Sequence, residues 1–159
     1  MPNKNLFINF SSTVKDEALD YYFKHILRRA VCATLVHEGF DLPSEVSITL
    51  CDNEYIRCLN KEYRGKDTPT DVLSFPMFDL SAGDEPLPEE ERVPLGDIVI
   101  SLERAREQAR ELGNTFLEEV AFLTVHSMLH LLGYDHERSK EEDEAQCAAQ
   151  REIVKTLDI

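Results

Sequence analysis

The chain has 159 residues, of which 42% are hydrophobic and 30% charged, so we expect one domain, residues 1–159, with a core that needs no disulfide support. No stretch approaches the roughly 18 apolar residues that cross a bilayer, so we expect no membrane-spanning segment. The net charge of −14 at pH 7 argues against a non-specific nucleic-acid binder, because such proteins rely on basic surfaces.

The first half of the chain predicts a strand, a helix, a strand and a helix. Residues 6–10 form an apolar run, LFINF, that is typical of a strand. Across residues 14–37 apolar side chains recur every three or four positions, which predicts a helix. Residues 46–50 alternate as VSITL, with the period of a half-buried strand. The next helix is expected over residues 53–63, with Asp52 as its N-cap.

The second half predicts two further strands and then three helices. Residues 72–75 are expected to form the third strand, which Pro76 stops, and residues 98–100 the fourth. Residues 79–94 between them are acidic and rich in proline and glycine, which predicts a loop. Three helices are then expected, over residues 101–112, 116–132 and 139–156.

Local signals mark the ends of these last helices. Gly113 is expected to stop the first, Asn114 to cap the second, and Ser139 to open the third with a capping box. The order of elements predicts an α+β fold, an α/β sandwich in which a small mixed four-stranded sheet is packed with about five helices.

The four cysteines are far apart in the sequence and form no C-x-x-C pair; they are Cys32, Cys51, Cys58 and Cys147. We therefore expect reduced thiols and a cytoplasmic protein. The first six residues lack the long apolar core of a signal peptide, which favours the same location.

Three of the five histidines lie within eleven residues, in the sequence HSMLHLLGYDH. His126 and His130 are four apart, so on a helix both rings lie on one face. His136 is too far along to join them on a continuous helix. Gly133 lies between, however, and glycine readily takes the left-handed conformation that ends a helix. The chain can then turn back and bring His136 to the same point.

Three neutral imidazoles with one open position are how a catalytic zinc site is built, although imidazole also suits nickel and copper. We therefore predict a metal ion bound by His126, His130 and His136 in a cleft. A histidine-bound metal lowers the pKa of water from about 16 toward about 7 and polarises a substrate oxygen, which suits hydrolysis of a phosphodiester or a peptide bond. The other two histidines, His25 and His37, are expected to be structural or surface residues.

The spacing H-x3-H-x5-H also matches that of the metzincin metallopeptidases, which place a glutamate general base directly after the first histidine. Here that position is Ser127, whose hydroxyl cannot take a proton from water as a carboxylate does. A metzincin-like metallopeptidase is therefore an alternative that lacks its key residue.

A second segment carries basic side chains at helical spacing. Arg57, Lys61 and Arg64 are four and three apart, on one face of the predicted helix. Arg64 lies at the end of this helix, where its guanidinium can bind phosphate oxygens through two hydrogen bonds. The other interpretation is a solvated basic face that binds nothing.

Taken together, three segments resemble the YbeY family of bacterial rRNA-maturation endoribonucleases. The family's H-G-x-L-H-L-x-G-Y-D-H corresponds to residues 126–136, its L-N-x-x-Y-R-x-K-D-x-P-T-D-V-L-S-F-P to residues 59–76, and its G-D-I-x-I-S to residues 96–101. One departure is Ser127 in place of the usual glycine. Because serine is small, we expect the helix to tolerate it, with a slight narrowing of the space behind the metal.

The resemblance implies a zinc-dependent, single-strand-specific endoribonuclease that acts in maturation of the 3′ end of small-subunit rRNA, in ribosome biogenesis and in quality control. It implies one Zn²⁺ per chain on His126, His130 and His136, and a functionally important arginine at Arg64. The expected partners are rRNA or another single-stranded RNA, and the small ribosomal subunit or its proteins. Neither a membrane nor DNA is expected as a partner.

Several roles near the histidines stay open. The general base is metal-activated water alone, the ribose 2′-hydroxyl, or Asp135 through a water. Asp135 is expected instead to orient a neighbouring ligand histidine. Tyr134 is expected to pack rather than to cover the site, and Asp71 and Asp97 are expected to be structural.

A third interpretation is a non-catalytic ribosome-assembly factor with a structural zinc site. Such sites are closed, usually by a cysteine, and the nearest, Cys147, lies eleven residues beyond His136. An acidic chain also suits docking on a basic ribosomal protein. We therefore expect weak intrinsic affinity for RNA, with a partner that supplies localisation.

Overall fold

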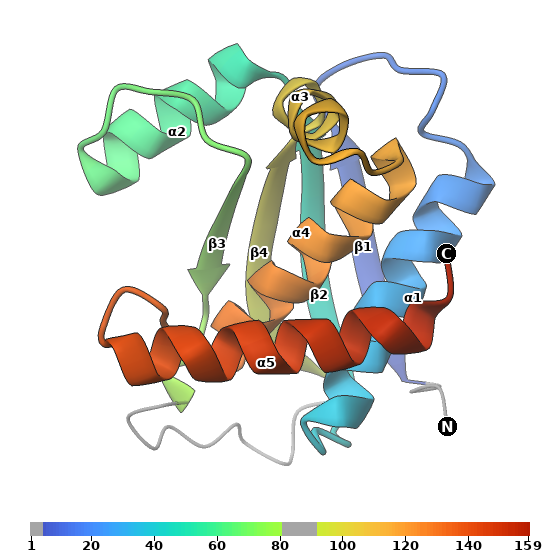
Figure 1. The fold of residues 1–159 in the computed structure, drawn as a ribbon, viewed down its shortest axis with the longest axis vertical. Helices are drawn as coiled ribbons and strands as arrows, with labels where there is room; N and C mark the ends of the chain where they lie inside the picture. The colour runs from blue at the N-terminus through green and yellow to red at the C-terminus, as the bar shows by residue number, and fades with distance from the viewer. Residues whose placement is uncertain (1–4, 81–91) are drawn as a thin grey trace.

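The computed structural model describes residues 5–80 and 92–159 (Figure 1). Within these residues the chain forms β1 (Leu6–Ser12), α1 (Tyr21–His37), β2 (Ser44–Cys51), α2 (Asn53–Arg64), β3 (Val72–Pro76), β4 (Val93–Ser101), α3 (Leu102–Leu112), α4 (Phe116–Leu131) and α5 (Lys140–Leu157). The predicted order of elements and the α+β class, with a mixed four-stranded sheet and five helices, are confirmed. No helix in the described ranges is long and apolar enough to cross a membrane.

The sheet has the strand order β1-β2-β4-β3. β1, β2 and β4 run parallel, and β3 pairs antiparallel with β4. The parallel pairs require crossover connections, which α1 provides between β1 and β2. β3 therefore lies at an edge of the sheet, beside the turn that follows α4.

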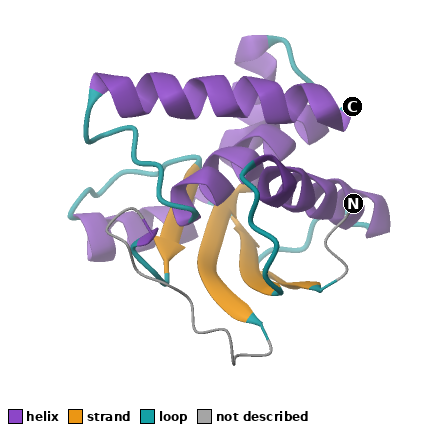
Figure 2. Ribbon diagram, turned by 90° about the horizontal axis from the view of Figure 1, so that it is seen from below, coloured by secondary structure: helices purple, strands orange, loops and turns teal. Residues whose placement is uncertain are grey.

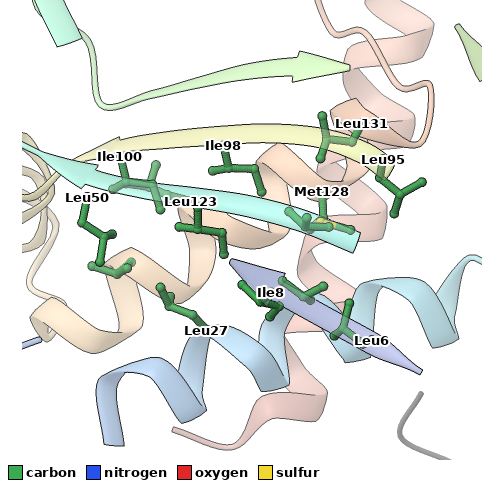
Figure 3. Close-up of a cluster of buried hydrophobic side chains, with 14 of the residues drawn as sticks. Leu6, Ile8, Leu27, Leu50, Leu95, Ile98, Ile100, Leu123, Met128 and Leu131 are labelled. Carbon is green, nitrogen blue, oxygen red and sulfur yellow. The ribbon is translucent and has the colours of Figure 1, made fainter. Parts of the chain in front are cut away.

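One face of the sheet is covered by α1 and α4, and α5 packs on their outer side (Figures 1 and 2). Side chains of the strands and of these two helices point toward one another in a close-packed core, among them Ile8, Ile98, Leu27 and Leu123 (Figure 3). The opposite side of α4 packs against α1 and α5. α4 is thus buried on most of its circumference, as its sequence predicts, and this buried helix carries the first two histidines.

The other face of the sheet is covered in part by α2. Ile56 packs there against Leu73 of β3 and Val99 of β4, which are directly paired. Because side chains alternate along a strand, Leu73 and Val99 point away from α4. The C-terminal end of α2 therefore reaches the edge strand β3 from the face opposite to the histidines.

α1 begins at Tyr21, so the prediction of a helix from residue 14 is wrong. The Asp20 side chain accepts a hydrogen bond from Phe23 N at 2.8 Å and caps the helix at that point. Val14 and Leu19 still pack against the core, but from the loop before the helix. Apolar residues at helical spacing therefore extended the prediction into a loop.

β4 begins at Val93, five residues before its predicted start, so the predicted loop over 79–94 is wrong at its end. Most of that loop, residues 81–91, lies outside the described residues. Pro94 pairs with Glu45 beside a shift in register, because Leu95 is an extra residue in β4. A strand tolerates proline at a bulge. The proline and the extra residue explain why residues 93–97 lack the sequence pattern of a strand.

The helix caps are mostly as predicted. Asp52 caps α2, Gly113 ends α3 in the left-handed conformation, and Ser139 accepts a hydrogen bond from Glu142 N at the start of α5. The Glu142 carboxylate, however, pairs with Arg138 at 3.0 Å and not with the backbone of Ser139, so only one half of the predicted capping box is formed. α4 is capped by Thr115 in a capping box with Glu118, so the prediction of Asn114 as its cap is wrong by one residue.

His37 joins the end of α1 to α5. Its Nε2 lies 2.7 Å from Glu152 Oε2 and its Nδ1 2.6 Å from Glu38 Oε2. The hydrogen bond with Glu152, and then that with Glu38, raise the pKa of His37 above its ordinary value. Since the folded pKa exceeds the unfolded value of about 6.5, this stabilisation is complete below that pH and is lost as pH rises through the folded pKa.

We expect His37→Gln to lower the free energy of unfolding at pH 5.5 by about 1 kcal/mol or less, because the Glu152 side chain is 69% exposed. The difference in stability should shrink as the pH rises through the folded pKa of His37. Urea unfolding across this pH range measures the difference. A difference that is the same at every pH would contradict the assigned ion pair.

Candidate active site

α4 places two of the predicted metal ligands, and the turn after it returns the third. His126 and His130 lie one turn apart in the second half of α4, and both are half-buried. Gly133 follows the helix with φ +112°, and the chain reverses there. The ring centroids of His126 and His136 are consequently 5.2 Å apart. The reversal that the glycine predicts is confirmed.

The three histidines line one cleft of about 220 Å³ together with Arg64. The edge strand β3 forms one wall, and the turn after α4 forms the other. The remaining lining residues are Val72, Leu73, Ser74, Asp135 and Glu137. All four predicted site residues, which lie up to 72 positions apart in the sequence, therefore meet at one place.

Hydrogen bonds orient two of the three imidazole rings. His126 Nδ1 donates to Gln150 Oε1 on α5 at 2.6 Å, and His130 Nδ1 donates to the Tyr134 carbonyl at 2.8 Å. Gln146 Nε2 donates to the His126 carbonyl at 3.3 Å. An imidazole that donates from Nδ1 keeps the lone pair of Nε2 for a metal, which is the arrangement usual around bound metal ions.

Burial is the main cause that lowers the pKa of His126, although the hydrogen bond with Gln150 opposes it. The nearby rings of His136 and His130 lower it further. The lowered pKa favours the neutral form of the imidazole, which is the form that binds metal. His136 Nδ1 is buried and has no hydrogen-bond partner among the described residues.

These donors suit a metal ion, since two are oriented by outer hydrogen bonds and the third has a buried, unpartnered nitrogen. As the side chains stand, however, no group of three or more His, Cys, Asp or Glu in residues 5–80 and 92–159 is arranged to hold one. The predicted cleft is present, whereas a formed three-histidine metal site is not seen. The metal therefore stays a prediction about this cleft.

Arg64 reaches the cleft from the end of α2, where Gly65 takes the left-handed conformation. Its Nη2 donates to Glu137 Oε1 at 3.0 Å. The other two members of the predicted basic face do not point to the cleft. Arg57 pairs with Glu54 and Asp67, and Lys61 lies 3.9 Å from Asp67. Of the three basic residues, Arg64 alone faces the histidines.

The carboxylate of Asp135 is used elsewhere than expected. It accepts a hydrogen bond from Glu137 N at 3.0 Å and pairs with Arg138 at 3.5 Å. The structure thus assigns the orientation of His130 to the backbone carbonyl of Tyr134 and not to Asp135. A backbone carbonyl does this because the turn after α4 folds back over the ring.

Tyr134 packs against the cluster between α1, α4 and α5, as expected. Burial, and then a hydrogen bond with Glu38, raise the pKa of its hydroxyl to about 12, so the phenol is protonated at neutral pH. Asp71 accepts from Val72 N at 2.7 Å and from Gln108 Nε2 at 3.1 Å, which suits its expected structural role.

A comparison with known protein families matches residues 9–158 to the model described as Endoribonuclease YbeY. The chain belongs to the YbeY family. An Endoribonuclease YbeY of Caldanaerobacter subterraneus is 56% identical over 117 residues, which cover 71% of this chain and 74% of the relative. That of Acetivibrio thermocellus is 44% identical over 153 residues, or 92% and 90% of the two chains.

A solution structure of TM1509 from Thermotoga maritima has the same fold, with a TM-score of 0.61 and 28% identity. The matched region covers 95% of this chain and 89% of the TM1509 chain. Membership of the YbeY family makes the chain an enzyme of the endoribonuclease class, a hydrolase.

Ser127, which stands where the YbeY family motif has glycine, is fully buried in α4. Its hydroxyl has no partner in the described part of the chain, and the cleft lining found there does not include it. The helix accommodates serine as expected, and the slight narrowing of the space behind the metal stays a prediction.

Sequence reasoning missed two residues at this YbeY site. Glu137 lies in an acidic stretch that looks like a solvated surface, and it pairs with Arg64 only through the fold. Gln150 had a usable signal, because Gln146 and Gln150 share the spacing of Ile153 and Leu157 on the buried side of α5. Amides on an otherwise apolar helix face indicate a buried polar partner.

Proposed function

We propose that this YbeY family member is a metal-dependent, single-strand-specific endoribonuclease of the cytoplasm, acting as one domain in 3′-end maturation of small-subunit rRNA. The observation that carries the proposal is the meeting of three imidazoles and one guanidinium in a single cleft. Imidazole nitrogen is a ligand for Zn²⁺, and guanidinium is the side chain best shaped for phosphate. This pair of chemistries suits cleavage of a phosphodiester.

We assign one Zn²⁺ to His126, His130 and His136, with Nε2 as the donor atom of the first two. Such an ion would activate water and polarise a phosphoryl oxygen. Nδ1 of His126 donates to Gln150, and Nδ1 of His130 donates to the Tyr134 carbonyl. Nε2 of each ring is therefore unprotonated and points away from that hydrogen bond. Burial lowers the pKa of His126, which favours the neutral, metal-binding form of this ring.

Arg64 is assigned to the scissile phosphate. Its guanidinium would stabilise negative charge as it develops on the phosphoryl oxygens. In the absence of RNA the same group binds the Glu137 carboxylate, which is an anion of similar geometry. Binding of the phosphate therefore requires Arg64 to release the Glu137 carboxylate and to bind the phosphate oxygens in its place.

The net charge of −14 keeps the intrinsic attraction for RNA weak, since phosphate binding depends on basic groups. We therefore propose that the small ribosomal subunit or one of its proteins brings the enzyme to its substrate. The substrate would be a single strand because a base-paired helix hides its bases from a cleft of this size.

Arg64→Ala is the test of this function. We expect kcat/KM on a fluorescent single-stranded RNA to fall about 100-fold, as for loss of one donor to a developing oxyanion. Zinc content, measured by mass spectrometry, should be unchanged. Lys61→Ala is the matched control, since Lys61 lies one turn earlier on α2 and is 3.9 Å from Asp67.

An equal fall in both variants would contradict a specific role for Arg64, as would full activity of Arg64→Ala. Zinc-loaded protein that cleaves no RNA would instead support the assembly-factor interpretation. Zinc-dependent cleavage of denatured casein would support the metallopeptidase.

A further inference from the structure

A second cavity, of about 630 Å³, adjoins the candidate active site. It lies between the end of β3, at Met77 and Phe78, and the turn after α4, at Gly133 and Arg138. Its lining shares His130 and Asp135 with the smaller cleft. The two hollows therefore adjoin at His130 and Asp135, and the volume of the second is typical of sites for small organic groups. A substrate bound at the histidines would have room to extend into it.

Two walls of this cavity offer flat or apolar surfaces. Phe78 is half-buried and packs against the main core, so its ring is held in place, and Met77 beside it is 58% exposed. On the other wall, Arg138 Nη2 donates to the Gly133 carbonyl at 2.7 Å, and its Nε lies 3.0 Å from Glu142 Oε2. Aromatic rings and fixed guanidinium planes are the groups on which unpaired nucleobases stack.

The charges of the cavity favour a base over a phosphate. It holds one arginine against two aspartates, Asp79 and Asp135, and Asp135 and Glu142 already pair with that arginine. Carboxylates outnumber guanidinium groups in this lining, which disfavours a phosphate, whereas the smaller cleft presents Arg64. Carboxylate oxygens do, however, accept hydrogen bonds from the exocyclic amino groups of bases.

We propose that this cavity binds the nucleobase next to the scissile phosphate, and that it prefers a base with an exocyclic amino group to uracil. The inference rests on the proposed function, because it takes the phosphate to lie at Arg64 and the histidines. It assigns to Phe78 and Met77 a role in substrate specificity. The strand then passes from Arg64, over His130, to the Phe78 wall.

The experiment uses a short single-stranded RNA with one mapped cleavage site and two derivatives in which the base on either side of that site is removed. For the wild type, we expect one of the two abasic RNAs to lose about tenfold in kcat/KM. The kcat/KM of Phe78→Leu on the intact RNA should be lower than that of the wild type by a similar factor. This variant should cleave the intact RNA and the affected abasic RNA at nearly the same rate. Uridine at the same position should be cleaved at a rate between those of the intact and the abasic RNA, because uracil keeps the stacking and lacks the exocyclic amino group.

Met77→Ala provides a second variant with little effect on folding, since its side chain is exposed, and it should weaken discrimination about threefold. Phe122→Leu is the matched control, because Phe122 is 38% exposed on α4 and is not part of either lining in the described residues. Thermal melts establish that each variant is folded. The proposal is overturned if the wild type cleaves both abasic RNAs as fast as the intact RNA, or if both variants discriminate as the wild type does.

Binding separates this proposal from the proposed function. The Kd of the three labelled RNAs for the wild-type protein is measured by fluorescence anisotropy with a chelator present. A wild type that never cleaves RNA but binds one abasic RNA more weakly refutes the nuclease function and supports the base site. Equal Kd values for all three RNAs in such a protein would refute both.

Discussion

Replacement of His130 by alanine is expected to remove both bound zinc and RNA cleavage. His130 belongs to the buried helix α4, and its ring is oriented by the Tyr134 carbonyl where the two cavities adjoin. Loss of a group that only hydrogen-bonds a metal ligand typically lowers metal affinity or activity 10- to 100-fold. Loss of the ligand itself should cost more, so we expect zinc affinity and cleavage rate each to fall by more than about 100-fold. Zinc content after dialysis and the initial rate of cleavage measure the two effects.

His25→Ala is the control for this variant. His25 stacks on Tyr21 at the start of α1 and is not part of the cleft lining in the described chain. It should keep wild-type zinc content and rate. Cleavage by His130→Ala at the wild-type rate would show that the metal-centred mechanism is wrong.

The second large effect is expected from Gly96→Ala, which should destabilise the fold by about 3 kcal/mol or more. Gly96 pairs with Pro76 of the edge strand and has φ +145°. A Cβ built there would lie 2.3 Å from the Phe75 carbonyl oxygen and 2.9 Å from Leu131 Cδ2. The carbonyl belongs to the backbone and cannot move without disturbing β3, which is a wall of the candidate active-site cleft.

Thermal unfolding should show a fall in Tm of roughly 6–12 °C for Gly96→Ala. Gly113→Ala is the matched control, because Gly113 has φ +74° but no atom within 4 Å of the position of a new Cβ. It meets only the backbone cost of the left-handed conformation, about 1 kcal/mol. Equal losses in the two variants would contradict the steric explanation.

Features set by a few neighbouring residues could be predicted from the sequence. The helix–turn that returns His136 to His126 depends on four-residue spacing and on one glycine, both of which are local. The caps at Asp52 and Gly113 are local too, since a cap bonds within three or four residues of itself. The predicted metal ligands therefore meet in space although no contact between elements was known.

Features that depend on pairing between distant segments could not be predicted. The start of β4 is decided by its register with β2, where Pro94 opposes Glu45 beside a bulge. The start of α1 is decided by Asp20, because the apolar Val14 and Leu19 pack equally well from a loop. Hydrophobic spacing records that a residue is buried and does not record which backbone conformation buries it.

The sequence by itself determined the order of the elements and identified the three histidines and Arg64 as candidate site residues. It could do so because periodicity and motif spacing are properties of short segments. Only the tertiary structure decided that Gln150 of α5 orients His126, that Glu137 holds Arg64, and that a second cavity beside Phe78 adjoins the cleft. The physical reason is that these contacts join segments whose separation in space is set by the packing of α4 between the sheet and α5. Hydrogen bonds and ion pairs act over a few ångströms, so they exist only after hydrophobic packing has brought such segments together.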